Sequence, residues 1–241
     1  MSDLDFDRRT FTAPLARRAA MVSILRKLFP QDGLIRLLDL GCGTGSQALN
    51  LAAAFPRMHC VGIDISGDSI ERACALAIRS PEGDRVQFLR CNYLTFEAMP
   101  FDVIIADSVL QNIFSSTTEL LQKLGRDLRS KGFLVASMPY DCPYNRVLWG
   151  SRRLLRALRG PWLDALIEVF GKKFHKSWDP TLIRERIPYM YLLPARVDGE
   201  AFRREMLALA GLELVSAENL ARTSPAQPKH RLLIFQKKAI Q

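Results

Sequence analysis

The sequence has few residues that ligate metals and no paired cysteines. Its three histidines stand alone at positions 59, 175 and 230, and its five cysteines include no C-x-x-C pair. No group of His, Cys, Asp and Glu has the spacing of a metal site. The odd cysteine count also argues against a disulfide framework. We therefore expect no bound metal, and free thiols in a reducing compartment.

Long hydrophobic runs are missing as well. No stretch reaches the roughly 18 apolar residues of a transmembrane helix. The acidic first residues, 1–7, lack the apolar core of a signal peptide. With 48% hydrophobic and 24% charged residues, the 241-residue chain has the composition of a folded domain. These features predict a cytoplasmic protein with a single domain over residues 1–241.

Positive charge is in excess, at +9 overall. It gathers in one segment, at Arg146, Arg152, Arg153, Arg156, Arg159, Lys172, Lys173 and Lys176, and leucines between the first five predict a basic amphipathic helix over 146–158. Such a face is often merely solvated. The functional alternatives are contact with an anionic membrane, an anionic substrate, or RNA. RNA ranks lowest, because no RNA-binding module is recognisable.

A buried strand and a glycine-rich turn organise the chain. The apolar stretch 34–40 predicts a strand buried on both faces. Gly41, Gly43 and Gly45 then allow a tight turn, and a helical pattern follows to about Phe55. This arrangement brings backbone N–H groups and a helix N-terminus to an adenosine-type ligand. The spacing G-x-G-x-G differs from the G-x-G-x-x-G of dinucleotide sites.

The run Leu-Asp-Leu-Gly-Cys-Gly-Thr-Gly, residues 38–45, resembles the first motif of class I S-adenosylmethionine-dependent methyltransferases. The resemblance covers roughly residues 34–138 and 199–238. It implies S-adenosylmethionine as cofactor and S-adenosylhomocysteine as product. The implied cofactor-binding residues are Asp39, Gly41, Cys42, Gly43, Gly45, Asp64, Ile65, Asn92, Tyr93, Ala106 and Asp107.

Within this set, several residues have specific expected roles. Asp64 ends the second strand, where an acid accepts hydrogen bonds from ribose hydroxyls. Ile65 is expected to pack on the adenine. Asn92 stands where relatives usually have Asp, and its side-chain oxygen can accept from the adenine amino group. Tyr93 either stacks on the adenine or covers the strand end.

Strands and helices alternate five times from residue 34 to 138, which predicts a parallel sheet with right-handed crossovers. The segment 221–229 is too short and polar for a crossover helix, so the last strand should pair antiparallel. The predicted fold is α/β, a Rossmann-like seven-stranded sheet with an antiparallel last strand and helices on both faces. Residues 139–198 break the alternation and are interpreted as a helical substrate lid inserted after strand five.

Acceptor contacts are expected from the lid and from the loop after strand four. The candidate substrate-binding residues are Gln111, Asn112, Tyr140, Trp178, Tyr189, Tyr191 and Arg196. A proton acceptor, where one is needed, is sought in His175 or Tyr140, although both are also ordinary surface residues. Many relatives have His in place of Asn112.

These patterns predict methyl transfer to O, N or C of a small molecule, with lipophilic or anionic acceptors preferred. The first alternative is a tRNA, rRNA or DNA methyltransferase. The second is a module of the same fold that binds the cofactor without turnover.

Overall fold

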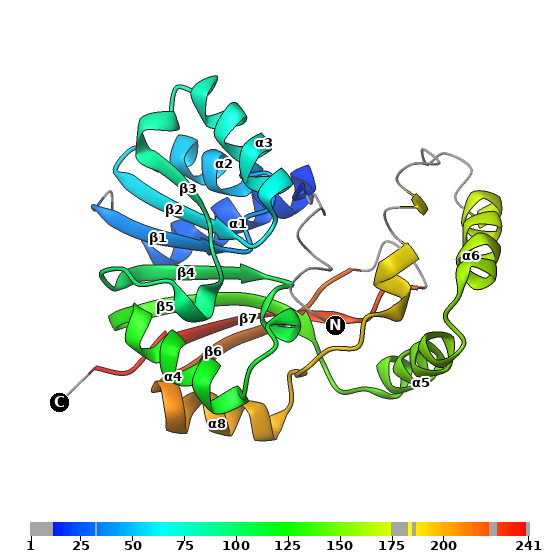
Figure 1. Ribbon diagram of the computed structural model, residues 1–241. Helices are drawn as coiled ribbons and strands as arrows, with labels where there is room; N and C mark the ends of the chain where they lie inside the picture. Colours follow the sequence, from blue (N-terminus) through cyan, green and yellow to red (C-terminus); the bar gives the residue numbers. More distant parts are fainter. Residues whose placement is uncertain (1–11, 32, 175–182, 185–186, 222–225, 240–241) are drawn as a thin grey trace.

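The computed structural model describes residues 12–31, 33–174, 183–184, 187–221 and 226–239. Its centre is a seven-stranded sheet in the order β3-β2-β1-β4-β5-β7-β6 (Figure 1). The strands are β1 Ile35–Leu40, β2 Met58–Asp64, β3 Val86–Arg90, β4 Phe101–Asp107, β5 Leu128–Pro139, β6 Leu212–Asn219 and β7 His230–Lys237. Only β7 runs antiparallel to both of its neighbours, β5 and β6. The predicted sheet and its antiparallel last strand are confirmed.

Helices cover both faces of the sheet, as predicted (Figure 1). One face packs against α1 Leu15–Leu28, α2 Ser46–Ala54 and α3 Gly67–Ile78. The other packs against α4 Thr117–Asp127 and α8 Glu200–Ala210. Short 3-10 helices occur at η2 Gly83–Arg85, η3 Tyr93–Thr95, η4 Leu110–Asn112 and η5 Ile187–Tyr191. None of the described helices is long and apolar enough to cross a bilayer.

Residues 139–198, hereafter the insertion, follow β5, and backbone hydrogen bonds join the two ends of this segment. Two helices, α5 Pro143–Ala157 and α6 Pro161–Phe174, follow β5 and project away from the sheet (Figure 1). The Asp198 N–H donates to the Pro139 carbonyl at 2.8 Å, and the Asp141 N–H donates to the Asp198 carbonyl at 3.1 Å. The insertion is therefore clamped at its base while its helices lie outside the layers.

The carboxyl ends of the parallel strands bring distant residues to one edge of the sheet. The turn after β1, the end of β2 and the end of β4 meet there, because β1 pairs in parallel with both β2 and β4. β7 begins at this same edge, with His230 opposite Pro139. Open α/β folds bind ligands at this edge.

Candidate functional site

The turn after β1 has a backbone that glycine adopts readily and other residues do not. Gly41, Gly43 and Gly45 have φ values of 71°, 54° and 74°, in the left-handed region. A Cβ on Gly41 would lie 2.4 Å from a methyl of Val109, and one on Gly45 would lie 2.4 Å from the Phe88 ring. The glycines therefore let the turn approach its neighbours closely. Their own N–H groups are used inside the fold, where they donate to the Ile63 carbonyl, the Asp64 carboxylate and the Cys42 carbonyl.

Asp64, at the end of β2, fixes this turn. Its Oδ2 accepts from the Gly43 N–H at 2.9 Å, and its Oδ1 accepts from the Ser66 N–H at 2.9 Å. Burial raises the pKa of Asp64, while these N–H donors oppose the rise. A carboxylate has about four acceptor positions, so Asp64 can still accept from the hydroxyl groups of a ligand.

Asp39 brings a buried carboxyl beneath the same turn. Its side chain is 3% exposed, and its Oδ2 has no hydrogen-bond partner among the described residues. Burial, and then the charges of Asp107 and Asp64, raise the pKa of Asp39 to about 7. Three carboxyl groups thus surround this corner of the sheet, and a cationic ligand would offset their mutual repulsion.

Asp107, at the end of β4, belongs to a hydrogen-bonded chain that no sequence motif indicates. The Ser137 hydroxyl on β5 donates to Asp107 Oδ1 and lies 3.0 Å from the Ser108 hydroxyl. The Ser108 hydroxyl in turn lies 3.3 Å from His230 Nδ1. Arg17 of α1 approaches the other oxygen of Asp107, with Nε 3.4 Å from Oδ2. We call Asp107, Ser137, Ser108 and His230 the edge network.

His230 is isolated in sequence but not in space. Burial, and then the charge of Arg17, lower its pKa to about 4, with Arg152 adding to the decrease and Asp107 opposing it. The imidazole is therefore neutral at pH 7 and can accept or donate a hydrogen bond. Ser108 has a φ of 61°, a strained conformation of the kind that clusters at functional sites. The sequence signal that could have found His230 is its place in the fold. An antiparallel last strand begins at the edge of the sheet where the parallel strands end, and His230 is its first residue.

The remaining predicted cofactor residues differ in placement. Cys42 and Ala106 are buried, and Ile65 is half-buried after β2. Asn92 uses its Oδ1 to accept from the Leu94 N–H at 3.0 Å. Tyr93 is 3% exposed within the core, with the Lys123 ammonium 4.9 Å from its ring centre. Of its two expected roles, the structure favours covering the strand end over stacking on adenine.

Arg196 has a structural role in place of the expected contact with substrate. Its guanidinium donates to the carbonyls of Leu110 at 2.8 Å, Ile113 at 2.6 Å and Ser115 at 2.7 Å. The side chain is 7% exposed. The prediction that Arg196 meets negative charge on an acceptor is not supported, because both terminal nitrogens hold the loop after β4 and Nε is buried without a partner among the described residues.

Tyr191 is likewise core and not a pocket wall. It is buried with Leu163 and Ile187 in a small cluster inside the insertion. Its hydroxyl donates to Asp164 Oδ1 at 2.5 Å, and burial and then Asp164 raise its pKa to about 12. The tyrosine joins α6 to η5, so the predicted contact with a substrate is not supported here either.

Other predicted acceptor residues lie near the loop after β4. The side-chain amides of Gln111 and Asn112 both donate to the Ser108 carbonyl, at 2.9 and 3.0 Å, and so support its conformation. Tyr140 lies at the base of the insertion, with the Arg231 guanidinium 4.0 Å from its ring centre. His175, Trp178 and the side chain of Tyr189 lie outside the described residues, so their roles stay predictions.

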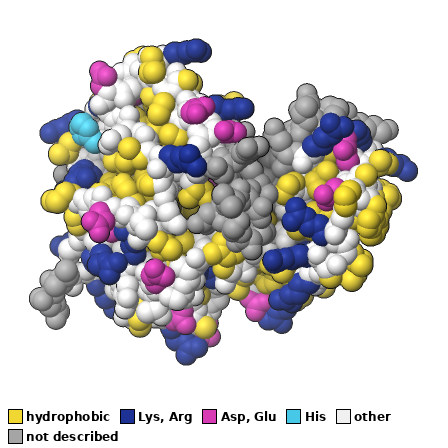
Figure 2. All heavy atoms as spheres, in the orientation of Figure 1, with side chains coloured by type: hydrophobic (Ala, Val, Ile, Leu, Met, Phe, Trp, Pro, Cys, Tyr) yellow, Lys and Arg dark blue, Asp and Glu magenta, His cyan; other side chains and the backbone are white. Residues whose placement is uncertain are grey.

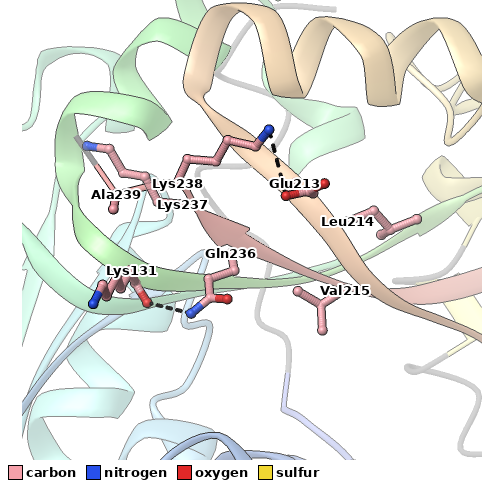
Figure 3. A pocket seen from close by; sticks show the side chains of 8 residues that line it. All are labelled: Lys131, Glu213, Leu214, Val215, Gln236, Lys237, Lys238 and Ala239. Carbon is pink, nitrogen blue, oxygen red and sulfur yellow. Dashed lines mark hydrogen bonds and ion pairs between the residues drawn. The ribbon is translucent and has the colours of Figure 1, made fainter. Parts of the chain in front are cut away.

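A separate groove lies at the opposite edge of the sheet, around the start of β5 and the end of β7 (Figure 3). There Lys238 pairs with Glu213 at 3.8 Å, and the Gln236 amide donates to the Lys131 carbonyl. None of the site residues described above lines it. Among the described residues, no group of three His, Cys, Asp or Glu side chains could hold a metal ion.

Comparisons with known proteins agree with this geometry. Residues 31–166 match a family model described as a methyltransferase domain. The trans-aconitate 2-methyltransferase of Methylobacterium radiotolerans is 30% identical over 205 residues, covering 80% of this chain and 72% of that protein. The enzyme of the same name from Azoarcus sp. is 33% identical over 140 residues, covering 57% of this chain and 50% of that protein. The chain thus spans about half the length of the first curated relatives it matches.

Solved structures share the fold at low sequence identity. The N-methyltransferase NodS from Bradyrhizobium japonicum, in complex with S-adenosyl-L-homocysteine, is 18% identical with a TM-score of 0.57. The alignment covers 97% of this chain and 90% of that one. At this identity the likeness concerns the fold alone.

Proposed function

The chain belongs to the class I S-adenosylmethionine-dependent methyltransferases, and from this premise we propose that it methylates a small-molecule acceptor at O, N or C. The observation that carries the proposal is the corner formed by the glycine turn and the carboxyl groups of Asp39, Asp64 and Asp107. The turn leads directly into the N-terminus of α2, whose first N–H groups suit the carboxylate of an amino-acid ligand. The three carboxyl groups suit its cationic part.

The residues present fit S-adenosylmethionine on two counts. Asp39 has a buried oxygen without a partner among the described residues, and the Asp64 carboxylate keeps acceptor positions beyond those that bind the Gly43 and Ser66 N–H groups. Gly41 and Gly43 would hold the methionine half, and Asp64 would hold the ribose hydroxyls. When bound, the cofactor supplies an electrophilic methyl group on a sulfonium ion.

The edge network supports the second part of the proposal, the handling of the acceptor. A neutral His230 with a hydrogen-bonded path to Asp107 can accept a proton at one imidazole nitrogen while Ser108 holds the other. His230 therefore replaces His175 as the first candidate base, with Tyr140 as the second. An acceptor held at this edge gains mainly from orientation, which can supply several kcal/mol, roughly 7–11 at the upper end.

The insertion has the position of a cover for this edge, because it leaves β5 beside Ser137. We propose that it encloses the acceptor and excludes water, and that its basic face contacts an anionic membrane. Lipophilic or anionic acceptors suit such a cover best. Methylation of nucleic acid is the alternative that excess positive charge alone would favour.

Transfer of label from methyl-labelled S-adenosylmethionine tests the proposal. The wild-type protein is incubated with a cell extract separated into lipid, water-soluble small-molecule, RNA and protein fractions. We expect incorporation into one of the two small-molecule fractions, and its loss in Asp64→Ala. Incorporation into RNA would support the nucleic-acid alternative. Cofactor binding without incorporation into any fraction would support the non-catalytic alternative.

A further inference from the structure

The insertion carries exposed apolar side chains at a density found nowhere else in the described residues. Of fifteen large apolar side chains that are exposed among the described residues, seven lie in the insertion, and six of these follow two helical stripes. They are Val147 (75% exposed), Leu154 (62%), Leu158 (50%), Trp162 (60%), Leu166 (44%) and Val169 (63%). Scattered exposed apolar residues need no explanation, but a contiguous group marks an interaction site. We call these six residues the insertion patch.

Helical spacing places the insertion patch on one stripe of each helix. Val147, Leu154 and Leu158 are seven and four residues apart along α5 and just past its end. Trp162, Leu166 and Val169 are four and three residues apart along α6. Residues at these intervals share one helix face.

The patch is not the face by which the helices fold. Leu155 of α5 and Leu163 and Ile167 of α6 pack with Ile187 and Tyr191. Each helix therefore has one apolar face that is already buried against η5 and a second that faces outward. The second face is left for something outside the insertion.

Charge around the patch identifies the kind of partner. Arg153, Arg156 and Lys173 are exposed and form no ion pair with any described residue. By contrast Arg146 pairs with Asp141 at 2.6 Å, and Lys172 pairs with Glu168 at 2.6 Å. Lys173 lies on the α6 stripe, four residues after Val169, and Arg153 lies next to Leu154 of the α5 stripe. Arg156 is two residues from both Leu154 and Leu158, and so lies on the other side of α5. Figure 2 shows hydrophobic and basic side chains together over the projecting helices.

We propose that the insertion patch docks on the surface of an anionic phospholipid bilayer. Its apolar side chains enter the boundary between headgroups and acyl chains, where tryptophan is also favoured. Arg153 and Lys173 contact lipid phosphates. A second copy of this chain is a poorer occupant, because it would bring the same unpaired positive charges together. An apolar protein surface would leave those charges unused.

Docking would place the carboxyl edge of the sheet near the bilayer, since α5 leaves β5 at that edge. A lipophilic acceptor could then reach the site without crossing water. This last step rests on the proposed function, whereas docking itself requires neither cofactor nor acceptor. A vesicle-binding assay therefore separates a failure of the docking surface from a failure of the methyl-transfer proposal.

Co-sedimentation with vesicles tests the docking surface. The full chain, without cofactor, is mixed with vesicles of phosphatidylcholine alone or of phosphatidylcholine with phosphatidylglycerol. We expect binding to the second, weakened by salt. Leu154→Asp combined with Val169→Asp should weaken it at least about tenfold. The matched control is Ile78→Asp, at another exposed apolar position on a helix, and it should bind as wild type does.

Charge is tested separately. Arg153→Gln with Lys173→Gln should weaken binding about fivefold for each charge removed. Arg26→Gln with Lys27→Gln, which removes the same charge from exposed positions on α1, should not. Brominated lipid should quench tryptophan fluorescence in the wild type and much less in Trp162→Phe. Failure of the wild type to bind anionic vesicles would overturn the proposal. Unchanged vesicle binding in the patch variants would also overturn it. So would a wild-type dimer in solution that the patch variants abolish.

Discussion

The glycine-turn corner and the insertion use apolar and small residues in opposite ways. Around the turn, Gly41 and Gly45 each face a neighbour at 2.4 Å from where a Cβ would stand, so the packing there leaves no freedom. In α5, a Cβ on Gly150 would meet nothing within 4 Å, and large apolar side chains point outward. The first region is determined by its internal contacts. The insertion has large apolar side chains that its own fold leaves exposed, and such side chains are available for a contact with a partner.

Alanine substitutions at Gly45 and Gly150 give the largest expected difference in the free energy of unfolding. Gly45→Ala places a Cβ against Phe88 and Ala73 at a φ of 74°. We expect it to lower the free energy of unfolding by about 3 kcal/mol, from backbone strain and overpacking. Gly150→Ala should raise that free energy by up to about 1 kcal/mol, because alanine favours a helix and has room. Urea unfolding of both variants measures the difference, and equal effects would remove the contrast.

Arg196 should behave as a core residue although it belongs to the insertion. Arg196→Ala leaves the carbonyls of Leu110, Ile113 and Ser115 without their shared donor. We expect a loss of about 2–3 kcal/mol in the free energy of unfolding. The exposed Arg153→Ala should cost less than about 0.5 kcal/mol. A small effect at Arg196 would show that the loop after β4 is held by other contacts.

His230 should make stability depend on pH. Its pKa is about 4 in the folded protein, against 6.5 ordinarily. Between these values the unfolded chain binds a proton that the folded chain does not, so stability falls as pH falls from about 6.5 to about 4. Arg17, Arg152, Asp107 and Ser108 are the groups that face the imidazole. His230→Gln should remove up to about 2 kcal/mol of this dependence, measured by urea unfolding across the range. An identical pH profile in the variant would place the titration elsewhere.

Asp39 gives a pH dependence of the opposite sign, and the effect measured on binding is a fraction of a proton. Its pKa of about 7 exceeds the ordinary 3.8, so the folded chain holds a proton between these values and loses stability as pH rises through them. A cationic ligand nearby favours the ionised carboxylate. At pH 7 we therefore expect cofactor binding to release about half a proton, detected by calorimetry in two buffers of different ionisation enthalpy. Asp39→Asn should show no such release.

Local motifs predicted which residues meet at the glycine-turn corner. The glycine spacing and the acid ending the next strand lie within 26 residues, Asp39 to Asp64, and each motif depends on backbone conformations that the residue types themselves require. The antiparallel last strand was also predictable, because segment 221–229 is too short for a crossover.

Long side chains and assembled clusters were not predictable in this way. Whether Arg196 meets a ligand or three backbone carbonyls depends on where the loop after β4 lies, which no local pattern specifies. The edge network draws on β4, β5 and β7, and Arg17 comes from α1. An aromatic residue such as Tyr191 is typical of a pocket wall, and only the tertiary packing shows that its side chain is buried in the core.

Calorimetric titration of S-adenosylmethionine tests the central claim most directly, namely that the glycine turn and Asp64 hold the cofactor while the insertion serves another contact. Wild type should bind, and Asp64→Ala should lose on the order of a hundredfold in affinity, since hydrogen bonds to a charged group each contribute about 1.5–3 kcal/mol. Leu154→Asp with Val169→Asp should bind within about twofold of wild type, a difference of roughly 0.4 kcal/mol. Wild-type affinity in Asp64→Ala, or loss of binding in the insertion variant, would contradict the account.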